Sequence, residues 1–508
     1  MFKWGIVKFG QGITLIVAAL LLLWMLVAVG QMPSLYQYPW WQFGVGLLIL
    51  TLIVALIIVA SRFLARRRTI WLHGTFLGLT LLKWPLIWLI RIVPTSDFWN
   101  YHALGSFSAQ GVSWQAMAQR GDLGAYLLFP HAINIANFWG LGMSFFGTNF
   151  AVSQVINVLM TWLDMWLLVM IVSRWLPRWV AISSALIFAA IPAYWLYSTL
   201  LNGAEPLFLT AILISISAFC KAIKPSDTMT KADVWFQLGI AWVGIVVANM
   251  IRPVMSVLII ALIILGLELA LQPVQSIIVK QTKFWEFIVV GVILITAVPM
   301  TYNWLYGVNF APNAVTVAYG TATGTDPKTN GAYNDKRLSS VSKTLEKASD
   351  ETVAYKKIQT ELHQQTQQNV QSLTQKQAWP AFLHLKMRNL MAEDYGYDWV
   401  LYNLQHNQPI NRWFYQIGGV LTVLSTGYLL GLLACALVSV VLGLVLLTKN
   451  SRLNNYFSYS ALLFDGFALS SLLFEVQGRY HVVLYLPLIL LIACGLAVKS
   501  GDLHRKIN

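Results

Sequence analysis

The sequence predicts an all-α polytopic membrane protein, and three observations support this prediction. Of the 508 residues, 57% are hydrophobic and only 11% are charged, whereas soluble globular proteins carry about a quarter charged residues. The mean hydropathy is +0.64. Apolar runs of the length that a transmembrane helix needs, about 20 residues, recur along the chain between short polar or basic connections. Because a helix satisfies its backbone polar groups internally, it is the expected structure for such runs in lipid.

We expect about twelve transmembrane helices. The first apolar run follows Lys3 and Lys8 without a convincing small-residue cleavage site, so we expect a retained span rather than a signal peptide. One long tract, 235–272, is broken by Arg252-Pro253, and we interpret the break as the boundary between two spans. Asp164 and Asp465 lie inside apolar runs and are expected to face other helices rather than lipid. The expected spans are 11–31, 43–62, 70–90, 150–173, 179–197, 206–220, 236–250, 254–271, 285–306, 425–447, 455–474 and 480–498.

The basic residues predict the orientation of these spans. More than half of the 34 Lys and Arg residues lie in alternate connections and near both ends of the chain, which the positive-inside rule assigns to the cytoplasm. The net charge of +14 therefore indicates membrane topology rather than nucleic-acid binding. The expected organisation is N-terminal spans in 1–90, a first outer loop with interfacial helices in 91–149, central spans in 150–306, a partly soluble helical outer segment in 307–411, and C-terminal spans with a cytoplasmic tail in 412–508.

The stretch from Pro94 to His102 opens the first outer loop, where an apolar run gives way to polar and aromatic residues. Its carboxylate, Asp97, is a candidate reactive group. An Asp shortly after a proline is also a common helix N-cap, which accepts hydrogen bonds from the first backbone N–H groups. The candidate side chains for binding a sugar or an acceptor are Tyr101, His102, Trp99, Trp114 and Trp139. An aromatic belt at the membrane interface explains most of the tryptophans equally well.

Further polar groups fall on the same predicted outer face. Charged groups at membrane depth are costly unless they line an aqueous cavity or bind something, so their collection suggests a site. Arg252, inside an apolar tract, needs a carbonyl, carboxylate or phosphate partner. Glu205 is a further candidate for binding the acceptor or the sugar, although it precedes a proline, which favours its interpretation as a turn and helix-start residue. Arg479, His481 and Lys83 also fit interfacial side chains that extend to water.

Other signals are weak. The sequence has neither a P-loop pattern nor an Asp-x-Asp pattern, which disfavours ATP and nucleotide-sugar chemistry. The three cysteines show no paired spacing that would indicate a metal site or a redox couple. Asp97, His102 and Asp122 are candidate ligands for a divalent cation, but they do not form a clear ligand set. No cofactor is therefore assigned, and metal dependence stays open.

A family resemblance rests on two short motifs and on the overall architecture. The first outer loop opens with Asp97, and the last span is preceded by Glu475-Val-Gln-Gly-Arg-Tyr-His481 and Leu-Tyr-Leu-Pro487. This arrangement resembles the GT-C membrane glycosyltransferases, in particular the bacterial relatives of the dolichyl-phosphate-mannose protein mannosyltransferases and the aminoarabinose transferases. The resemblance implies that Asp97 is the general base. It also maps the family's Arg-Tyr pair onto Arg479 and Tyr480, and its Arg-Pro pair onto Arg252 and Pro253.

The function implied is an inverting hexosyl- or pentosyltransferase that uses a polyprenyl-phosphate-linked sugar at the outer face of the cell membrane. Arg479 is the first candidate for binding the donor phosphate, with Arg252, Lys83, His481 and Tyr480 as further candidates. A protein, a glycolipid or a cell-wall polymer could be the acceptor; the membrane lipid is the other expected partner, and nucleic acid is not. A flippase or transporter, for which internal repeats and paired broken helices are expected, and a polysaccharide polymerase or ligase are the alternatives.

Overall fold

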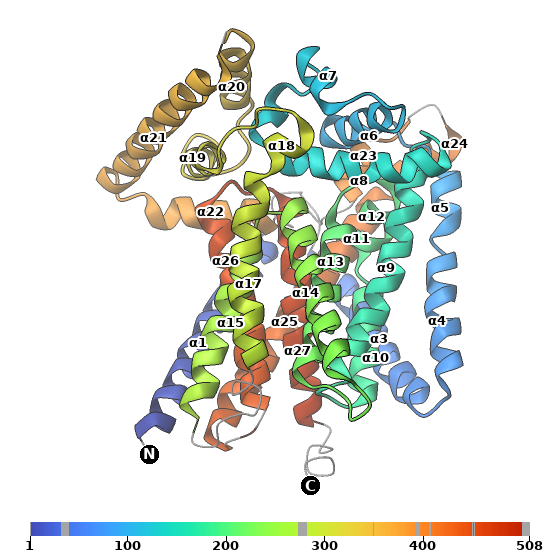
Figure 1. Ribbon diagram of the computed structural model, residues 1–508. Coiled ribbons are helices and arrows are strands. Elements are labelled where there is room, and N and C mark those ends of the chain that lie inside the picture. Colours follow the sequence, from blue (N-terminus) through green and yellow to red (C-terminus); the bar gives the residue numbers. More distant parts are fainter. Residues whose placement is uncertain are drawn as a thin grey trace.

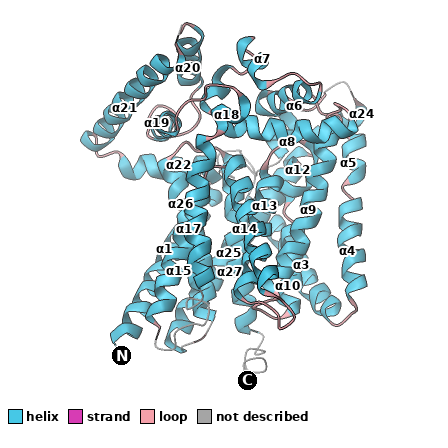
Figure 2. Ribbon diagram, in the orientation of Figure 1, coloured by secondary structure: helices cyan, strands magenta, loops and turns pink. Residues whose placement is uncertain are grey.

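The computed structural model describes residues 2–31, 40–272, 282–348, 350–391, 397–405, 408–449, 451 and 453–499. Within these ranges the chain forms α-helices, three short 3-10 helices and two isolated β-bridges. Figure 2 shows helices throughout the described part of the molecule. The prediction of an all-α protein is therefore confirmed.

Long apolar helices form a bundle that makes up the larger part of the molecule (Figure 1). The described residues contain nine helices that are long and apolar enough to cross a membrane, and a tenth if one bent pair is counted as a span. The nine lie in α1 (Phe2–Gly30), α3 (Trp40–Ala65), α4 and α5 (Thr69–Leu81 and Trp84–Leu89), α9 (Ala151–Val172), α13 (Glu205–Ile223), α14 (Lys231–Ile251), α17 (Thr282–Met300), α25 (Gly418–Leu446) and η3 with α27 (Gly478–Leu484 and Tyr485–Lys499).

The predicted number of about twelve spans is not confirmed. The expected span 179–197 is the bent pair, in which α10 (Arg178–Ala189) meets α11 and α12 (Pro192–Trp195 and Tyr197–Leu200) at 65°. The expected span 254–271 corresponds to α15 (Met255–Leu271), which has only 17 residues. The expected span 455–474 corresponds to α26 (Leu453–Leu473), which is not among the nine.

Prolines account for the two breaks inside apolar tracts. Pro192 begins α11, and a proline cannot continue a helix without losing a backbone hydrogen bond and clashing with the preceding turn. Before Pro253, Arg252 adopts an extended backbone (φ −139°, ψ 115°), as expected for a residue whose α conformation is disfavoured by the following proline. The tract 235–272 is thus divided at Arg252-Pro253, as predicted.

Short helices lie across one end of the bundle, which we call the Asp97 end (Figure 1). They are α6 (Ser96–Ala109), α7 (Trp114–Gln119), η1 (Gly124–Leu128) and α8 (Pro130–Phe146). Helices α6 and α8 approach closely because Gly105 and Gly140 face each other: a Cβ on Gly105 would lie 2.8 Å from the Ala136 carbonyl oxygen. Helix α1 begins and α27 ends at the opposite end, which we call the terminal end.

Further helices cover the same Asp97 end. They are α18 (Tyr302–Tyr306), α19 (Asn313–Gly324), α20 (Asp335–Glu346), α21 (Glu351–Gln375), α22 (Trp379–Met391), α23 (Tyr397–Tyr402) and α24 (Pro409–Gln416). Residues 313–391, which we call the cap segment, form a small core together with Leu128 of η1, to which Val315, Tyr319, Ile358 and Leu362 belong. Helix α22 is also fixed to α1, because the indole N–H of Trp24 donates to Nδ1 of His384 at 3.1 Å.

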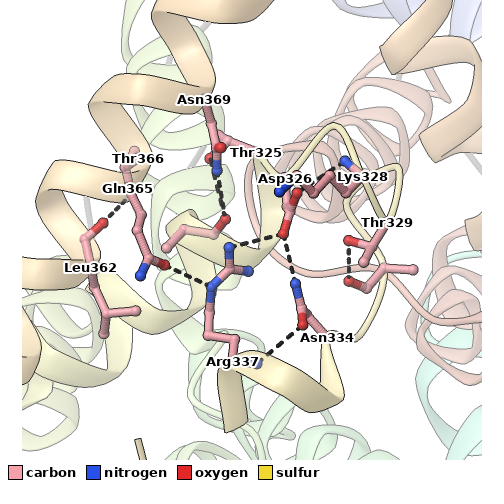
Figure 3. A network of polar contacts seen from close by, with 12 residues as sticks. Thr325, Asp326, Lys328, Thr329, Asn334, Arg337, Leu362, Gln365, Thr366 and Asn369 are labelled. Atoms are coloured by element: carbon pink, nitrogen blue, oxygen red, sulfur yellow. Dashed lines mark hydrogen bonds and ion pairs between the residues drawn. The ribbon is translucent and has the colours of Figure 1, made fainter. Parts of the chain in front are cut away.

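A polar network holds the cap segment together (Figure 3). The carboxylate of Asp326 accepts hydrogen bonds from Nη2 of Arg337 at 2.9 Å and from the side-chain amide of Asn334 at 2.7 Å. Arg337 also donates from Nε to Gln365 of α21 at 3.1 Å. This ion pair is 8% exposed at Arg337 and 6% at Asp326, so it is a buried structural pair and not a surface contact.

Candidate functional site

The chain positions Asp97 at the start of α6. Asn403 fixes the residue before the helix, because its side-chain oxygen accepts from the backbone N–H of Thr95 at 2.6 Å and from its hydroxyl at 2.9 Å. Ser96 then has a positive φ of 52°, which a non-glycine residue rarely adopts. The N-cap residue is Thr95, so the interpretation of Asp97 as the N-cap is wrong. Asp97 lies in the first turn, and its carboxylate hydrogen-bonds with side chains from elsewhere in the chain.

The carboxylate of Asp97 forms an ion pair with a residue 382 positions away. Nη2 of Arg479 donates to Oδ2 of Asp97 at 2.6 Å. The hydroxyl of Tyr126 donates to the other oxygen at 2.9 Å and itself accepts from the side-chain amide of Asn100 at 2.8 Å. The side chains of Asp97 and Arg479 are 27% and 12% exposed. The pair is therefore largely withdrawn from water, although part of the Asp97 side chain stays accessible.

These contacts determine the charge of Asp97. Burial acts to raise the pKa of the carboxyl, but the charge and hydrogen bond of Arg479 and the hydrogen bond from Tyr126 together hold it below its usual value. For Tyr126, burial and the neighbouring Asp97 charge raise the pKa of the phenol. At neutral pH the site therefore contains an ionised carboxylate beside a protonated phenol.

A second cation lies next to the first. The ring of Tyr480 is 5.6 Å from the guanidinium carbon of Arg479 and 5.6 Å from that of Arg252, within the usual range for cation–π contacts. Arg252 forms an ion pair with Glu205, the first residue of α13, which is only 3% exposed. Arg479 also lies 5.5 Å from the centre of the Trp399 ring. Two guanidinium groups and two carboxylates thus converge around one tyrosine.

Some predicted site residues belong to this cluster by contact, and others lie beside it. Tyr101 is buried in the same helix as Asp97, and burial with the Asp97 charge raises the pKa of its phenol. Trp99 is 52% exposed, and its ring lies 6.3 Å from that of His102. His102 in turn contacts Phe150, and burial lowers the pKa of its imidazole. Trp99 and His102 therefore form an aromatic pair of their own on α6.

Four predictions need correction. His481 is 1% exposed and contacts the Leu390 carbonyl and the Tyr485 hydroxyl, so it neither extends to water nor meets Asp97. Lys83 is 3% exposed and donates to the Tyr194 carbonyl at 3.0 Å and to Thr161 at 3.3 Å, so it does not reach the lipid headgroups. Two of the three tryptophans that were candidates for a sugar-binding surface are buried in hydrophobic cores. They are Trp114 and Trp139, at 8% and 0% exposed.

Sequence reasoning missed three residues at the site. Tyr126, Asn100 and His131 match no motif, and nothing in their local sequence distinguishes them from other residues of the first loop. His131 lies in the first turn of α8. Burial and the charge of Arg252 lower the pKa of its imidazole to about 4, although Asp97 acts in the opposite direction. It is therefore neutral at pH 7 and can donate or accept a hydrogen bond there.

The candidate cation ligands do not gather. Asp122 pairs with Arg120 at 2.8 Å instead of joining Asp97. In the part of the chain that the structure describes, no three His, Cys, Asp or Glu side chains lie close enough together to hold a metal ion. The described side chains thus give no fit for a divalent cation at Asp97.

Comparisons with known proteins find similarity to solved structures and not to family models or curated sequences. No protein-family model matches the sequence, and no curated protein matches it. Two solved structures are similar. Both are crystal structures of ArnT from Cupriavidus metallidurans, one bound to undecaprenyl phosphate and one in the apo state. Their sequence identities to this chain are 10% and 11%, and the TM-scores are 0.34 and 0.35. The two alignments cover 86% and 85% of this chain, and each covers 79% of the ArnT chain. Similarity at this level does not assign a function.

Proposed function

We propose that this protein is an inverting GT-C-like glycosyltransferase, which moves a hexose or pentose from a polyprenyl-phosphate donor to an acceptor at the outer face of the cell membrane. The observation that carries the proposal is the Asp97–Arg479 pair at one end of a bundle of apolar helices. It combines an ionised carboxylate with a guanidinium group, the two functions that such a reaction needs, where a lipid-linked substrate can reach them.

Asp97 acts as the general base. The acceptor hydroxyl attacks the anomeric carbon and transfers its proton to the Asp97 carboxylate as the new C–O bond forms. The bond between the anomeric carbon and the phosphate oxygen breaks, and its electron pair leaves with the polyprenyl phosphate. Because the single base acts on the side opposite the leaving group, the product has inverted configuration; a retaining enzyme would need a second carboxylate as nucleophile.

Arg479 binds the donor phosphate, with Arg252 as the second cation. A guanidinium group matches the geometry of phosphate oxygens and forms strong charge-assisted hydrogen bonds with them. Tyr480 keeps the two guanidinium groups close together, and Glu205 positions Arg252. Glu205 is therefore assigned to orientation rather than to the sugar.

The ion pair also explains how the base is kept inactive without donor. A carboxylate whose pKa is lowered by Arg479 is a weak base. When the donor phosphate engages Arg479, it competes with Asp97 for the guanidinium, and burial then raises the carboxyl pKa toward a value suited to accepting a proton. Donor binding therefore prepares the base for the acceptor hydroxyl.

The acceptor approaches from the exposed side of α6. Trp99 presents a half-exposed indole there, with His102 beside it. Aromatic faces pack on the apolar faces of sugars, and the neutral imidazole of His102 can hydrogen-bond a hydroxyl. We assign Trp99 and His102 to acceptor binding, with a protein, a glycolipid or a cell-wall polymer as the acceptor classes, and both chain termini to the cytoplasm.

The test replaces Asp97 with Asn and measures consumption of polyprenyl-phosphate hexoses and pentoses, with release of polyprenyl phosphate, in membranes that contain envelope acceptors. The variant keeps the shape of the side chain and loses the base, so we expect a rate roughly 10²- to 10⁴-fold lower. Asp326→Asn is the matched control, because it removes one partner of another buried ion pair in the cap segment. It should change the rate per folded molecule less than about twofold, because Asp326 pairs with Arg337 in the cap segment and not with the Asp97 cluster; its effect should appear in the free energy of unfolding.

Full activity of Asp97→Asn would remove the general-base assignment. An equal loss in both variants would mean that the Asp97–Arg479 pair is only structural. If the wild-type protein consumes no donor of either sugar class, the proposed function is wrong.

A further inference from the structure

A cavity lies inside the bundle on the side of the terminal end, away from Asp97. It has a volume of about 790 Å³ and is enclosed by α9, α13, α15, α17, α26 and α27. Its walls are mainly apolar, and Leu168, Phe219, Leu262, Phe287 and Leu490 are typical of them. This volume is within the range of roughly 300–1,000 Å³ that is usual for small-molecule sites. Packed protein interiors leave few voids larger than a water molecule, so a cavity of this size calls for an occupant.

Basic side chains surround the mouth of this cavity. A second cavity of about 480 Å³ shares Lys224 and Pro225 with the first and is also lined by Arg174 and Lys221. Nζ of Lys224 lies 5.0 Å from the centre of the Trp175 ring, which lines the first cavity. The two spaces therefore meet where α9 and α13 end.

The basic side chains of this mouth have no carboxylate beside them in the described lining. The described residues that line the two cavities include no Asp or Glu. None of the ion pairs between described residues involves Arg174, Lys221 or Lys224. In addition, Nε of Arg174 is buried and lacks a hydrogen-bond partner. A buried guanidinium N–H without an acceptor is costly, so an anionic oxygen at this position would relieve the cost.

We propose that this site binds an anionic membrane phospholipid, with an acyl chain in the apolar cavity and the phosphate group on Arg174, Lys221 and Lys224. Basic pockets between helices at the cytoplasmic side are typical sites for acidic lipid headgroups, and the anionic inner leaflet supplies such lipids. A free phosphate ion would leave the apolar cavity unfilled. A much longer polyprenyl chain would not fit a space of 790 Å³.

This lipid site is independent of the proposed sugar transfer. It shares no residue with the Asp97, Arg479, Arg252 and Tyr480 cluster. It also contacts α13 and α27. The opposite end of α13 carries Glu205, and the opposite end of α27 follows residues 473–479, which we call the Arg479 loop. The lipid would therefore stabilise the helices that position the Asp97 cluster.

Native mass spectrometry of the full chain, with added phosphatidylglycerol or with phosphatidylethanolamine of the same acyl chains, tests the proposal. We expect tighter binding of phosphatidylglycerol. Lys221→Gln combined with Lys224→Gln should weaken this binding about 25-fold, at roughly fivefold for each basic residue. The control is Arg66→Gln combined with Arg68→Gln, two exposed residues of the α3–α4 connection that line neither cavity; it should leave binding unchanged.

A second measurement locates the acyl chain and does not depend on any variant. Phosphatidylglycerol with a photoactivatable group in its acyl chain should label peptides from α13 and α27 that line the cavity. Labelling confined to lipid-facing residues of α3, or equal binding of the two phospholipids, would overturn the proposal. Tighter binding of undecaprenyl phosphate, lost in the double lysine variant, would overturn the choice of occupant and identify a polyprenyl carrier instead.

Discussion

Replacing Arg479 with Gln removes the guanidinium group from the pair with Asp97 and keeps most of the side-chain volume. An exposed ion pair contributes about 0–1 kcal/mol, and breaking a buried one costs about 3–5 kcal/mol. Here the two side chains are 12% and 27% exposed, between these limits. We therefore expect the free energy of unfolding to fall by about 2–3 kcal/mol at pH 7. The rate of donor consumption should be about 10²- to 10³-fold lower, as for removal of one oxyanion-stabilising group.

The pH dependence of this loss follows from the pKa of Asp97. In the wild-type protein the folded pKa is lowered, so the pair stabilises the fold above the unfolded carboxyl pKa, about 3.9. This stabilisation is lost as the pH falls through the lower folded value. Without Arg479, burial is the largest influence and the folded pKa lies above the unfolded one. The destabilisation by the buried carboxyl then grows as the pH rises from the unfolded pKa to the folded pKa, so the two proteins should differ most at pH 7 and least near pH 4.

The assay is the apparent unfolding temperature in detergent from pH 4 to pH 8, together with donor consumption at varied donor concentration. Arg479→Lys is the informative comparison, because lysine keeps the charge and loses the two-pronged geometry; it should retain more activity than Arg479→Gln. Equal activity of the two variants, or a stability difference that does not change with pH, would refute the reasoning.

Two further predictions concern positions that support the site. Gly105→Ala should lower the free energy of unfolding by about 1–3 kcal/mol through overpacking, because the new Cβ would lie 2.8 Å from the Ala136 carbonyl oxygen. Gly74→Ala is the control, since a Cβ there would meet nothing within 4 Å. The measurement is the unfolding temperature of each variant. Burial lowers the pKa of Lys386 to about 7, so the unfolded chain binds more protons above that pH and wild-type stability should rise between pH 7 and 10. A Lys386→Met variant should lose this slope in a pH series of unfolding temperatures, whereas an unchanged slope would mean that another group causes it.

The sequence predicted the architecture well where one physical property dominates. Apolar length and proline position determine the helices, which is why the break at Arg252-Pro253 was placed correctly. The number of spans was less certain, because α15 and α26 are near the limit of length or polarity at which a helix crosses a membrane. Span counts are least secure for such helices.

The site was predictable only in part. A charged residue in an apolar context must have a partner, and this rule singled out Arg252, whereas Arg479 was chosen from the family resemblance. Neither argument named Glu205 and Asp97 as their partners. Lys83 also obeys this rule, but its partners are carbonyl and hydroxyl groups inside the bundle, so the expectation that it extends to water was wrong. Tyr126 and His131 gave no signal, since their place at the site depends on tertiary contacts: Tyr126 of η1 hydrogen-bonds with Asp97 of α6, and α8, which carries His131, packs against α6.

The contact between the cap segment and the Arg479 loop has a consequence for chimeric proteins. The backbone N–H of Val476 donates to the Gly331 carbonyl at 2.9 Å, and Nζ of Lys386 donates to the Gly324 carbonyl at 2.5 Å. Gly324 has no room for a side chain, because a Cβ would lie 2.5 Å from the Phe474 carbonyl carbon. A cap segment grafted from another protein must therefore be exchanged together with residues 473–479, or the graft will displace Arg479 from its ion pair with Asp97.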